Sequence, residues 1–422
     1  MSAPVNGVGA GRSTDRPALA RLVAVAADAF ARDHWGRAPL LTPAAELGGG
    51  FADLFSLDAV DELVSRRALR TPFVRMAKDG EVLPPARYTA PGGYGAEVGD
   101  QVASAKVLQE VADGATLVLQ GLHRTWEPIA ELTRHLAAEL GHPCQVNAYV
   151  TPAQSRGFDP HYDVHDVFVL QVHGEKHWRI HDPVHPDPLR SQPWSDHRDA
   201  VAQRATERPA IDETFRPGDA LYLPRGWIHS ATALGGISIH LTIGVSSYTR
   251  YDVVQEVLAR VAASPELRGS LPFGLDLDDP AAATPVVEQA LAELVTVLEK
   301  AQADPATAEG VRRALAARLA RDVPAAPVRP LATVDALSRF GVDDVVVLRG
   351  GLHPRLVVDG GSVVLRLPRS AVTLPVAAHP ALQALLTGTP VRVGDLPDLD
   401  AESAVVVARR LVREGVLVPV GA

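Results

Sequence analysis

The chain has 422 residues, of which 46% are hydrophobic and 22% are charged. This is ordinary globular composition, so it excludes a disordered, a collagen-like or a disulfide-scaffold protein. The formal net charge of −9 argues against a general nucleic-acid-binding or anionic-membrane surface, and a single cysteine, Cys144, fits a reducing cytosol. Ten of the 15 histidines lie between His142 and His240, so we expect the chemistry of the protein in that segment.

The first 248 residues are predicted to hold a tail and one mixed domain. Residues 1–16 are small and polar, and we expect a disordered tail that lacks the apolar region of a secretory signal. Three segments then place apolar side chains at helical spacing: 18–33, 57–70 and 125–141. From Gln145, short apolar alternations such as QVNAYVTP and ISIHLTIGV lie between Pro, Gly and Asp clusters, which is typical of a β-sandwich or barrel. A charged, Pro-rich insertion, residues 183–212, separates two of these strands.

The second half is predicted to be helical first and mixed afterwards. Residues 249–325 hold three amphipathic segments, which form either a bundle on the barrel or a dimer seam. Residues 331–422 follow a Pro-rich linker and contain a hairpin around Gly360, then two helices and a strand, which is winged-helix order. This module carries nine arginines and nine acidic residues, so we expect a structural wing without direct DNA binding. No uncharged apolar run approaches about 18 residues, so we expect no membrane span.

The segment FDPHYDVHDVFVLQVHGEKHW, residues 158–178, carries the central motif. On a strand, side chains two apart share a face, so His161 and Asp163 are expected to point together. His229, from a neighbouring strand, is the best candidate for a third ligand. Two imidazoles and one carboxylate form the facial triad of non-heme Fe(II) oxygenases, which leaves positions open for a 2-oxo acid and O₂. The alternative is a hydrogen-bonded His–Asp pair in the core.

Two other histidine–aspartate pairs have the same spacing but lie in the insertion without a strand pattern, so we expect solvated loop residues at 185–187 and 197–199. His165 shares the face of the central pair, and either completes a His-x-Asp-x-His cupin site or, as we favour, lines the substrate mouth. Lys176, one of only four lysines, shares a strand face with Trp178, and its ammonium suits the distal carboxylate of a 2-oxo diacid. The alternative for Lys176 is a solvated surface lysine. His240 is expected either behind the ligands or in the core.

These motifs, with NAYVTPAQSRGFDPHYDVHDVFVLQVHGEKHWRI and PGDALYLPRGWIHSATALGGISIHLTI around them, resemble the JmjC-type ribosomal oxygenases, a branch of the 2-oxoglutarate-dependent protein hydroxylases. The resemblance implies an α+β fold with a double-stranded β-helix (jelly-roll or cupin) barrel over 17–248, a helical dimerisation region over 249–325 and a winged-helix-like domain over 331–422. It also implies that the metal triad falls on His161, Asp163 and His229. Around it, the resemblance assigns 2-oxoglutarate binding to three further residues: Lys176, Tyr149 and Asn147. The sequence departs from the family at Gly244, where relatives carry a hydroxyl, and at His165.

The resemblance therefore implies an Fe(II)- and 2-oxoglutarate-dependent dioxygenase that uses O₂ to hydroxylate a protein side chain, with Arg or His of a ribosomal protein as the first expectation. A cytoplasmic homodimer is the expected form. The nearest alternative keeps this chemistry and changes the substrate to a peptide natural product or a small metabolite. Two others are a non-catalytic cupin or winged-helix regulator, and a Zn or Mn cupin enzyme that uses His165 as a ligand.

Overall fold

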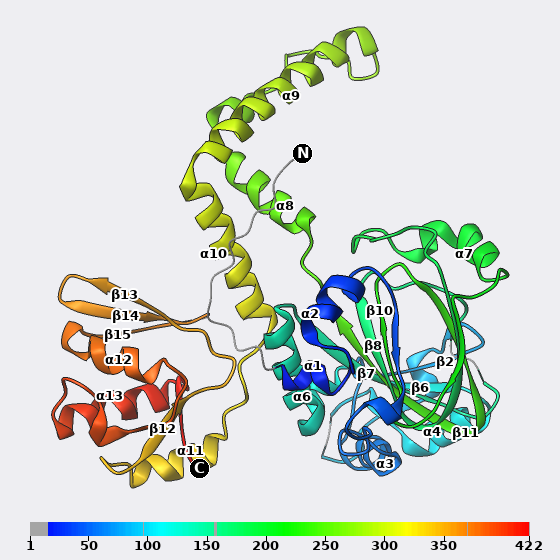
Figure 1. Cartoon of the computed structure of the whole chain (residues 1–422), viewed down its shortest axis with the longest axis horizontal. Coiled ribbons are helices and arrows are strands. Elements are labelled where there is room, and N and C mark those ends of the chain that lie inside the picture. Colours follow the sequence, from blue (N-terminus) through cyan, green and yellow to red (C-terminus); the bar gives the residue numbers. More distant parts are fainter. Residues whose placement is uncertain (1–15, 96, 156–157, 369, 422) are drawn as a thin grey trace. The chain divides into compact units, whose positions relative to one another are not determined.

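The computed structural model describes residues 16–95, 97–155, 158–368 and 370–421. The tail expected over 1–16 therefore lies outside the described residues, apart from its last position. The chain divides into two compact units, one up to Ser247 and one from Tyr248 (Figure 1). Each unit is described by itself below.

The first unit is built on a nine-stranded sheet in the order β1-β10-β8-β11-β7-β6-β2-β3, with β9 paired to β8 beside this path. Every pairing in it is antiparallel. The strands are β1 (Leu40–Thr42), β2 (Val74–Lys78), β3 (Glu81–Val82), β6 (Thr116–Leu119), β7 (Cys144–Thr151), β8 (Asp166–His181), β9 (Ile211–Phe215), β10 (Ala220–Leu223) and β11 (Ile228–Val245). A separate two-stranded ribbon joins β4 (Thr89–Ala90) and β5 (Gln101–Val102).

Two long strands, β8 and β11, close this sheet into the barrel that the sequence predicts. The first half of β8 pairs with β10 and its second half with β9, while β11 follows β8 along both halves. The two strands approach closely at Gly174, which has a φ of +63°. A Cβ at this position would lie 2.2 Å from the Ile237 carbonyl oxygen, so only glycine fits there. The sequence pattern had suggested two shorter strands here, and Gly174 lets one strand bend instead.

Short helices cover one part of this sheet and complete the core: α1 (Pro17–Ala20), α2 (Ala27–Ala29), a π-helical turn (Phe30–His34), α3 (Leu57–Arg66), α4 (Ser104–Ala112), α5 (Leu122–Thr125) and α6 (Glu127–Leu140). The prediction of one continuous helix over 18–33 is wrong. The Glu139 carboxylate accepts the free N–H groups of Ala18 and Leu19 at 2.9 and 2.8 Å, which fixes α1 against α6. The chain then turns so that Leu22 and Val23 are also buried. The predicted end of α6 is confirmed, because Gly141 caps it with a φ of +75°.

The insertion between β8 and β9 is partly ordered rather than a plain loop. It contains a 3-10 turn (Trp194–His197) and α7 (Arg198–Arg204). Tyr162 and Val201 are buried here, together with Ile228 from the start of β11. The insertion therefore has a small core of its own, next to the residues that precede β8.

The second unit begins with three helices, α8 (Arg250–Val261), α9 (Pro280–Ala303) and α10 (Pro305–Asp322). It continues with α11 (Pro330–Ser338), α12 (His379–Leu385) and α13 (Ala401–Arg413), which pack with two three-stranded sheets around a second hydrophobic core. The sheets are β16-β12-β17, from β12 (Val345–Leu348), β16 (Val391–Arg392) and β17 (Leu417–Pro419), and β13-β14-β15, from β13 (Arg355–Asp359), β14 (Ser362–Arg366) and β15 (Ala371–Pro375). The predicted hairpin is confirmed, since Asp359 pairs with Ser362.

One helix in the described part of the chain, α9, is long and apolar enough to cross a membrane by length and composition alone. The sequence had predicted no such span. Only 6% of its most apolar window is buried in this structure, and Glu288 and Glu293 interrupt its apolar residues. A carboxylate at the centre of a bilayer costs several kcal/mol, so this finding is weak evidence for membrane contact.

Candidate metal and cosubstrate site

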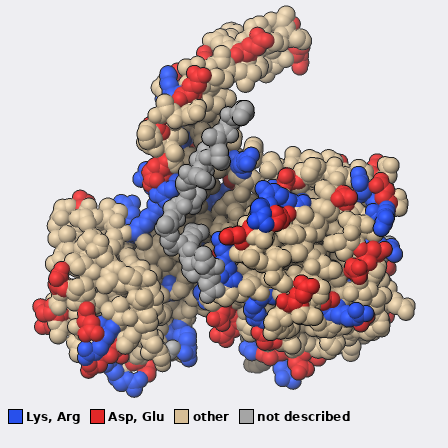
Figure 2. Space-filling view, in the orientation of Figure 1, with Lys and Arg blue, Asp and Glu red and all other residues tan. Residues whose placement is uncertain are grey.

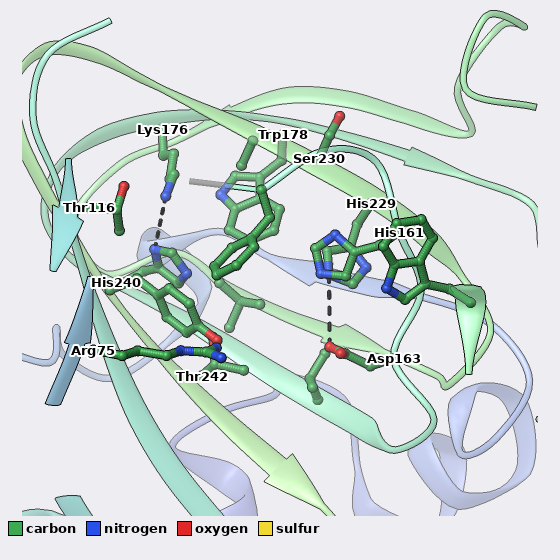
Figure 3. Close-up of a pocket in the computed structure, with 16 residues that line it drawn as sticks. Arg75, Thr116, His161, Asp163, Lys176, Trp178, His229, Ser230, His240 and Thr242 are labelled. Carbon is green, nitrogen blue, oxygen red and sulfur yellow. Dashed lines mark hydrogen bonds and ion pairs between the residues drawn. The ribbon is translucent and has the colours of Figure 1, made fainter. Parts of the chain in front are cut away.

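Among the residues that the structure describes, one group of three could hold a metal ion: His161, Asp163 and His229. One ligand atom from each side chain lies within 4.8 Å of the other two. The His229 Nε2 atom lies 3.8 Å from Asp163 Oδ2, and the two imidazole rings are 4.4 Å apart between centroids (Figure 3). These are the residues that the sequence predicts, and they converge at the mouth of the barrel.

The predicted reason for this convergence is wrong in one respect. His161 and Asp163 do not lie on a continuous strand, because β8 begins only at Asp166. His161 instead forms an isolated antiparallel bridge with His229, in which each backbone N–H donates to the carbonyl of the other residue at 3.2 and 2.8 Å. This pair of backbone hydrogen bonds sets the two imidazoles side by side, and Asp163 follows two residues later.

Each imidazole is also oriented through its second nitrogen. His161 Nδ1 lies 2.7 Å from the Asp159 carbonyl oxygen, and His229 Nδ1 lies 3.2 Å from the Trp227 carbonyl oxygen. Nδ1 therefore serves as the donor in both rings, and Nε2 is left as the lone-pair atom, which is how a metal-binding histidine is fixed.

The charge states of the triad also suit a divalent cation. Burial, reinforced by His161, lowers the pKa of His229 to about 4, so the ring is neutral at pH 7. Burial by itself would raise the pKa of Asp163, but the surrounding histidines outweigh it and the pKa is lowered. The donor set is two imidazoles, of which His229 is held neutral, and one carboxylate, which fits Fe(II) and leaves coordination positions open.

A cavity of about 260 Å³ extends from this triad into the barrel. Its walls combine aromatic and aliphatic side chains with a similar share of polar and charged ones. The lining residues are Arg75, Thr116, Tyr149, Phe158, His161, Asp163, Val167, Val169, Lys176, Trp178, Trp194, His229, Ser230, Ala231, His240 and Thr242.

Lys176 lies in this cavity, as predicted from strand parity, and the surface-lysine alternative is wrong because the residue is only 4% exposed. Its Nζ atom donates to Thr151 Oγ1 at 3.1 Å and lies 3.5 Å from His240 Nδ1. In the part of the chain that the structure describes, no carboxylate pairs with it. Burial lowers its pKa to about 7. A buried ammonium without an anion fits an incoming carboxylate.

Tyr149 and Asn147, on β7, differ in their relation to the cavity. The Tyr149 ring lines it and stacks on His240 with the ring centroids 4.9 Å apart and the planes within 3°. Asn147 is not among the lining residues, and its Oδ1 accepts the Gly121 N–H at 3.1 Å. The resemblance assigns Asn147 to the cosubstrate site, but the structure occupies its Oδ1 with the Gly121 N–H and leaves it out of the cavity lining.

His165 is placed beside the triad and not within it. Its Nδ1 atom is buried without a hydrogen-bond partner and lies 4.0 Å from Asp163 Oδ2. It belongs neither to the three-ligand group nor to the cavity lining, so the structure does not bring it to the expected substrate mouth. Its ring occupies the space that a side chain at 244 would fill, since a Cβ on Gly244 would lie 2.7 Å from His165 Nε2. Gly244 and His165, the two positions at which the sequence departs from the family, therefore pack against each other.

The histidine–aspartate pairs of the insertion do not form ligand groups. The His185 and His197 rings stack with centroids 4.6 Å apart, and Asp187 pairs with Arg225 at 3.1 Å. Sequence reasoning missed several residues that line the cavity, among them Arg75 from β2, Phe158 and Trp194. Trp194 comes from the Pro-rich insertion, which has no pattern that would predict a role in the site.

Comparison with known proteins agrees with this geometry. Residues 123–253 match the JmjC domain family. The chain is 30% identical over 282 residues to the bifunctional lysine-specific demethylase and histidyl-hydroxylase NO66 of Drosophila persimilis, which covers 62% of this chain and 36% of that protein. It is 34% identical over 235 residues to ribosomal oxygenase 1 of Gallus gallus, covering 54% of this chain and 36% of that protein. The chain thus spans about a third of the length of these relatives.

The fold resembles that of the Escherichia coli ribosomal oxygenase YcfD, with a TM-score of 0.53 at 21% identity over 94% of this chain and 99% of that one. A structure of YcfD in complex with cobalt and 2-oxoglutarate matches with a TM-score of 0.52 at 20% identity over 95% of this chain and 99% of that one. The barrel is therefore a JmjC barrel of the cupin type. Residues 123–253 thus form a JmjC domain, and the chain is similar to JmjC ribosomal oxygenases in sequence and in fold.

Proposed function

We propose that the chain is an Fe(II)- and 2-oxoglutarate-dependent oxygenase that hydroxylates an Arg or His side chain of a ribosomal protein. One observation carries the proposal: a facial triad lies at one end of a cavity, and a buried lysine without a carboxylate partner in the described chain lies further in. This arrangement can chelate a 2-oxo acid and hold its far carboxylate. The relatives named above supply the expectation of a ribosomal substrate.

In this proposal, His161, Asp163 and His229 hold the metal, and Lys176 holds the distal carboxylate of 2-oxoglutarate. When bound, the metal and 2-oxoglutarate activate O₂ and supply the oxidant. The protein contributes position and a dry environment. Hydrogen bonds from the two Nδ1 atoms keep the imidazoles oriented, and the aromatic rings of Phe158 and Trp178 shield part of the cavity from water. Tyr149, whose pKa is raised by burial and by Asp163, stays protonated and can donate a hydrogen bond.

The test is 2-oxoglutarate turnover by the full chain with Fe(II), measured as succinate, together with the bound metal content. His161→Ala is expected to lose metal and to lower turnover by at least about a hundredfold, because the protein would supply only three metal ligands and the variant removes one of them. His177→Ala is the matched control, since His177 lies on β8 and bonds to Asp212 at 2.8 Å, away from the cavity. Unchanged iron-dependent turnover in His161→Ala would contradict the assignment.

Three alternatives predict different results in such experiments. A Zn or Mn cupin enzyme with His165 as a ligand would retain Zn or Mn after anaerobic purification and would lose it in His165→Ala. A non-catalytic regulator would form no succinate at all. An enzyme acting on a peptide natural product or a small metabolite would form succinate but leave ribosomal proteins unmodified.

We further propose that helices α8 to α10 form a homodimer seam. Six apolar side chains on α8 and α9 are each at least 40% exposed: Val253, Val254, Leu258, Val287, Leu291 and Val295. The face of α9 seen in Figure 2 is largely uncharged, whereas acidic and basic side chains are interspersed over the first unit. A second copy would cover this surface without burying Glu288 in lipid. Light scattering should give the mass of a dimer, and Leu291→Glu should shift it to that of a monomer.

We propose a cytoplasmic protein whose C-terminal module is a structural winged-helix-like wing. The single cysteine and the mixed charge of the module support this proposal. Retention of a labelled duplex by the full chain at 150 mM salt would contradict it.

A further inference from the structure

The cavity contains a second cation that the proposed chemistry does not use. Arg75 projects from β2 into the cavity, and in Figure 3 its guanidinium lies below His240, with Lys176 above. Its Cζ atom lies 5.3 Å from the centre of the Phe158 ring, and the guanidinium hydrogen-bonds to the Tyr149 hydroxyl. The Nε atom is buried without a hydrogen-bond partner, and no ion pair to Arg75 is found in the described residues.

The charges of the occupied site leave this guanidinium unbalanced. A divalent metal and the Lys176 ammonium together match the Asp163 carboxylate and the two carboxylates of 2-oxoglutarate. One of those carboxylates would bind the metal and the other Lys176, so neither would need Arg75. The Arg75 side chain therefore adds one positive charge, and its buried Nε–H still lacks an acceptor beyond the Tyr149 hydroxyl that the guanidinium already contacts.

The cavity lining near the metal suits a planar target. The rings of Phe158 and Trp194 lie 6.0 and 6.2 Å from the His161 ring, so a flat side chain can pack between aromatic faces beside the metal. Both an imidazole and a guanidinium are flat, so shape does not separate the two targets of the proposed function. Charge does, because a second guanidinium would enter a site that already carries an unbalanced cation.

We propose that Arg75 is a specificity-determining residue: it donates a hydrogen bond to an acceptor on the target side chain, and so selects a neutral, acceptor-bearing residue such as histidine over arginine. This inference rests on the proposed function and narrows its substrate class. It also assigns a role to a residue that the proposed chemistry leaves without one.

The experiment uses the full chain and ribosomal proteins from cells that lack the gene. Mass spectrometry after reaction with Fe(II) and 2-oxoglutarate maps the hydroxylated residue, and a synthetic peptide spanning that residue is then paired with the same peptide carrying arginine there. Calorimetry with Mn(II) and 2-oxoglutarate, without O₂, gives the affinity for each peptide independently of turnover. The variants are Arg75→Gln and Arg75→Lys, and Arg179→Gln, on the exposed side of β8, is the matched control.

The expected product lies on histidine or another neutral acceptor residue. The arginine peptide should bind wild type at least about tenfold more weakly than the native peptide, because like charges meet. Arg75→Gln should weaken binding of the native peptide by about tenfold and so reduce the difference in affinity between the two peptides. Arg75→Lys should preserve this difference in affinity. The KM for 2-oxoglutarate should change less than about twofold in all three variants.

Three results separate failure of the inference from failure of the proposed function. A product on arginine would overturn the inference and leave the proposed function intact. A tenfold higher KM for 2-oxoglutarate in Arg75→Gln, with unchanged peptide affinity, would also overturn it, because Arg75 would then belong to the cosubstrate site. Absence of both succinate and hydroxylated product with wild type would instead overturn the proposed function.

Discussion

The binding of 2-oxoglutarate should become weaker as the pH rises through neutrality, because Lys176 must be protonated to hold a carboxylate. Burial lowers the pKa of Lys176 to about 7, from an ordinary value of 10.5. Above that pH the free protein carries mainly the neutral amine, and each further pH unit reduces the ammonium fraction about tenfold. The carboxylates of 2-oxoglutarate stay ionised throughout, so the dependence comes from the protein.

The size of the effect follows from this protonation equilibrium. The apparent affinity equals the intrinsic affinity multiplied by the fraction of protein in the competent state. With a pKa of about 7, the Kd for 2-oxoglutarate should rise about fivefold between pH 7 and pH 8, and about tenfold more by pH 9. The bound carboxylate raises the pKa of Lys176, so the complex itself does not titrate in this range.

The assay is 2-oxoglutarate binding to the Mn(II)-loaded protein without O₂, followed by tryptophan fluorescence. Trp178 is a suitable reporter because Lys176 Nζ lies 5.9 Å from the centre of its ring. Lys176→Arg is the control, since a guanidinium stays charged at all these pH values and should give a flat profile. A flat profile for wild type between pH 6.5 and 9 would refute the reasoning.

Three further predictions concern residues around the site. Lys176→Met should stabilise the ligand-free protein by up to about 5 kcal/mol below pH 7. Between a pH of about 7, the pKa in the folded protein, and pH 10.5, the lysine binds more protons in the unfolded state than in the folded state. The stability of wild type therefore rises with pH, and the difference in Tm between Lys176→Met and wild type should shrink across that window. Asn147→Ala should lower the free energy of unfolding by about 1 kcal/mol, because the Gly121 N–H loses its acceptor, yet change the KM for 2-oxoglutarate less than about twofold. A tenfold change in that KM would restore Asn147 to the cosubstrate site. Gly244→Ala should destabilise the fold by about 1–3 kcal/mol through its clash with His165, and the added substitution His165→Ala should recover most of that loss in denaturant unfolding. Equal losses in the single and double variants would show that the two residues are independent.

The metal ligands were predictable from the sequence because a motif at fixed spacing also sat in an apolar segment. Lys176 was predictable by parity, since β8 is regular from Lys176 to Ile180 and alternate side chains face inward. Parity failed for His161 and Asp163, which precede the strand and are aligned by a backbone bridge to His229. The sequence thus predicts the three side chains that the structure brings together, but not the backbone geometry that aligns them.

Residues that reach the cavity from distant segments could not be predicted in this way. Arg75 lies on a five-residue strand far from the motif, and its place in the cavity depends on the pairing of β2 with β6 and of β6 with β7. Trp194 depends on the folding of a Pro-rich insertion that has no periodicity. The continuous helix predicted over 18–33 does not form for a related reason. A tertiary contact to Glu139 and the burial of Leu22 outweigh the local helical spacing of the apolar residues.

The most direct test of the central claim compares the masses of ribosomal proteins from cells with the intact gene, cells without it, and cells that carry His161→Ala. The proposed function predicts that one ribosomal protein is about 16 daltons heavier, by one oxygen atom, only where the intact gene is present. The same protein from the other two strains should be unmodified, and tandem mass spectrometry should place the oxygen on one side chain. Identical ribosomal protein masses in all three strains would contradict the claim that this chain is a ribosomal oxygenase in the cell.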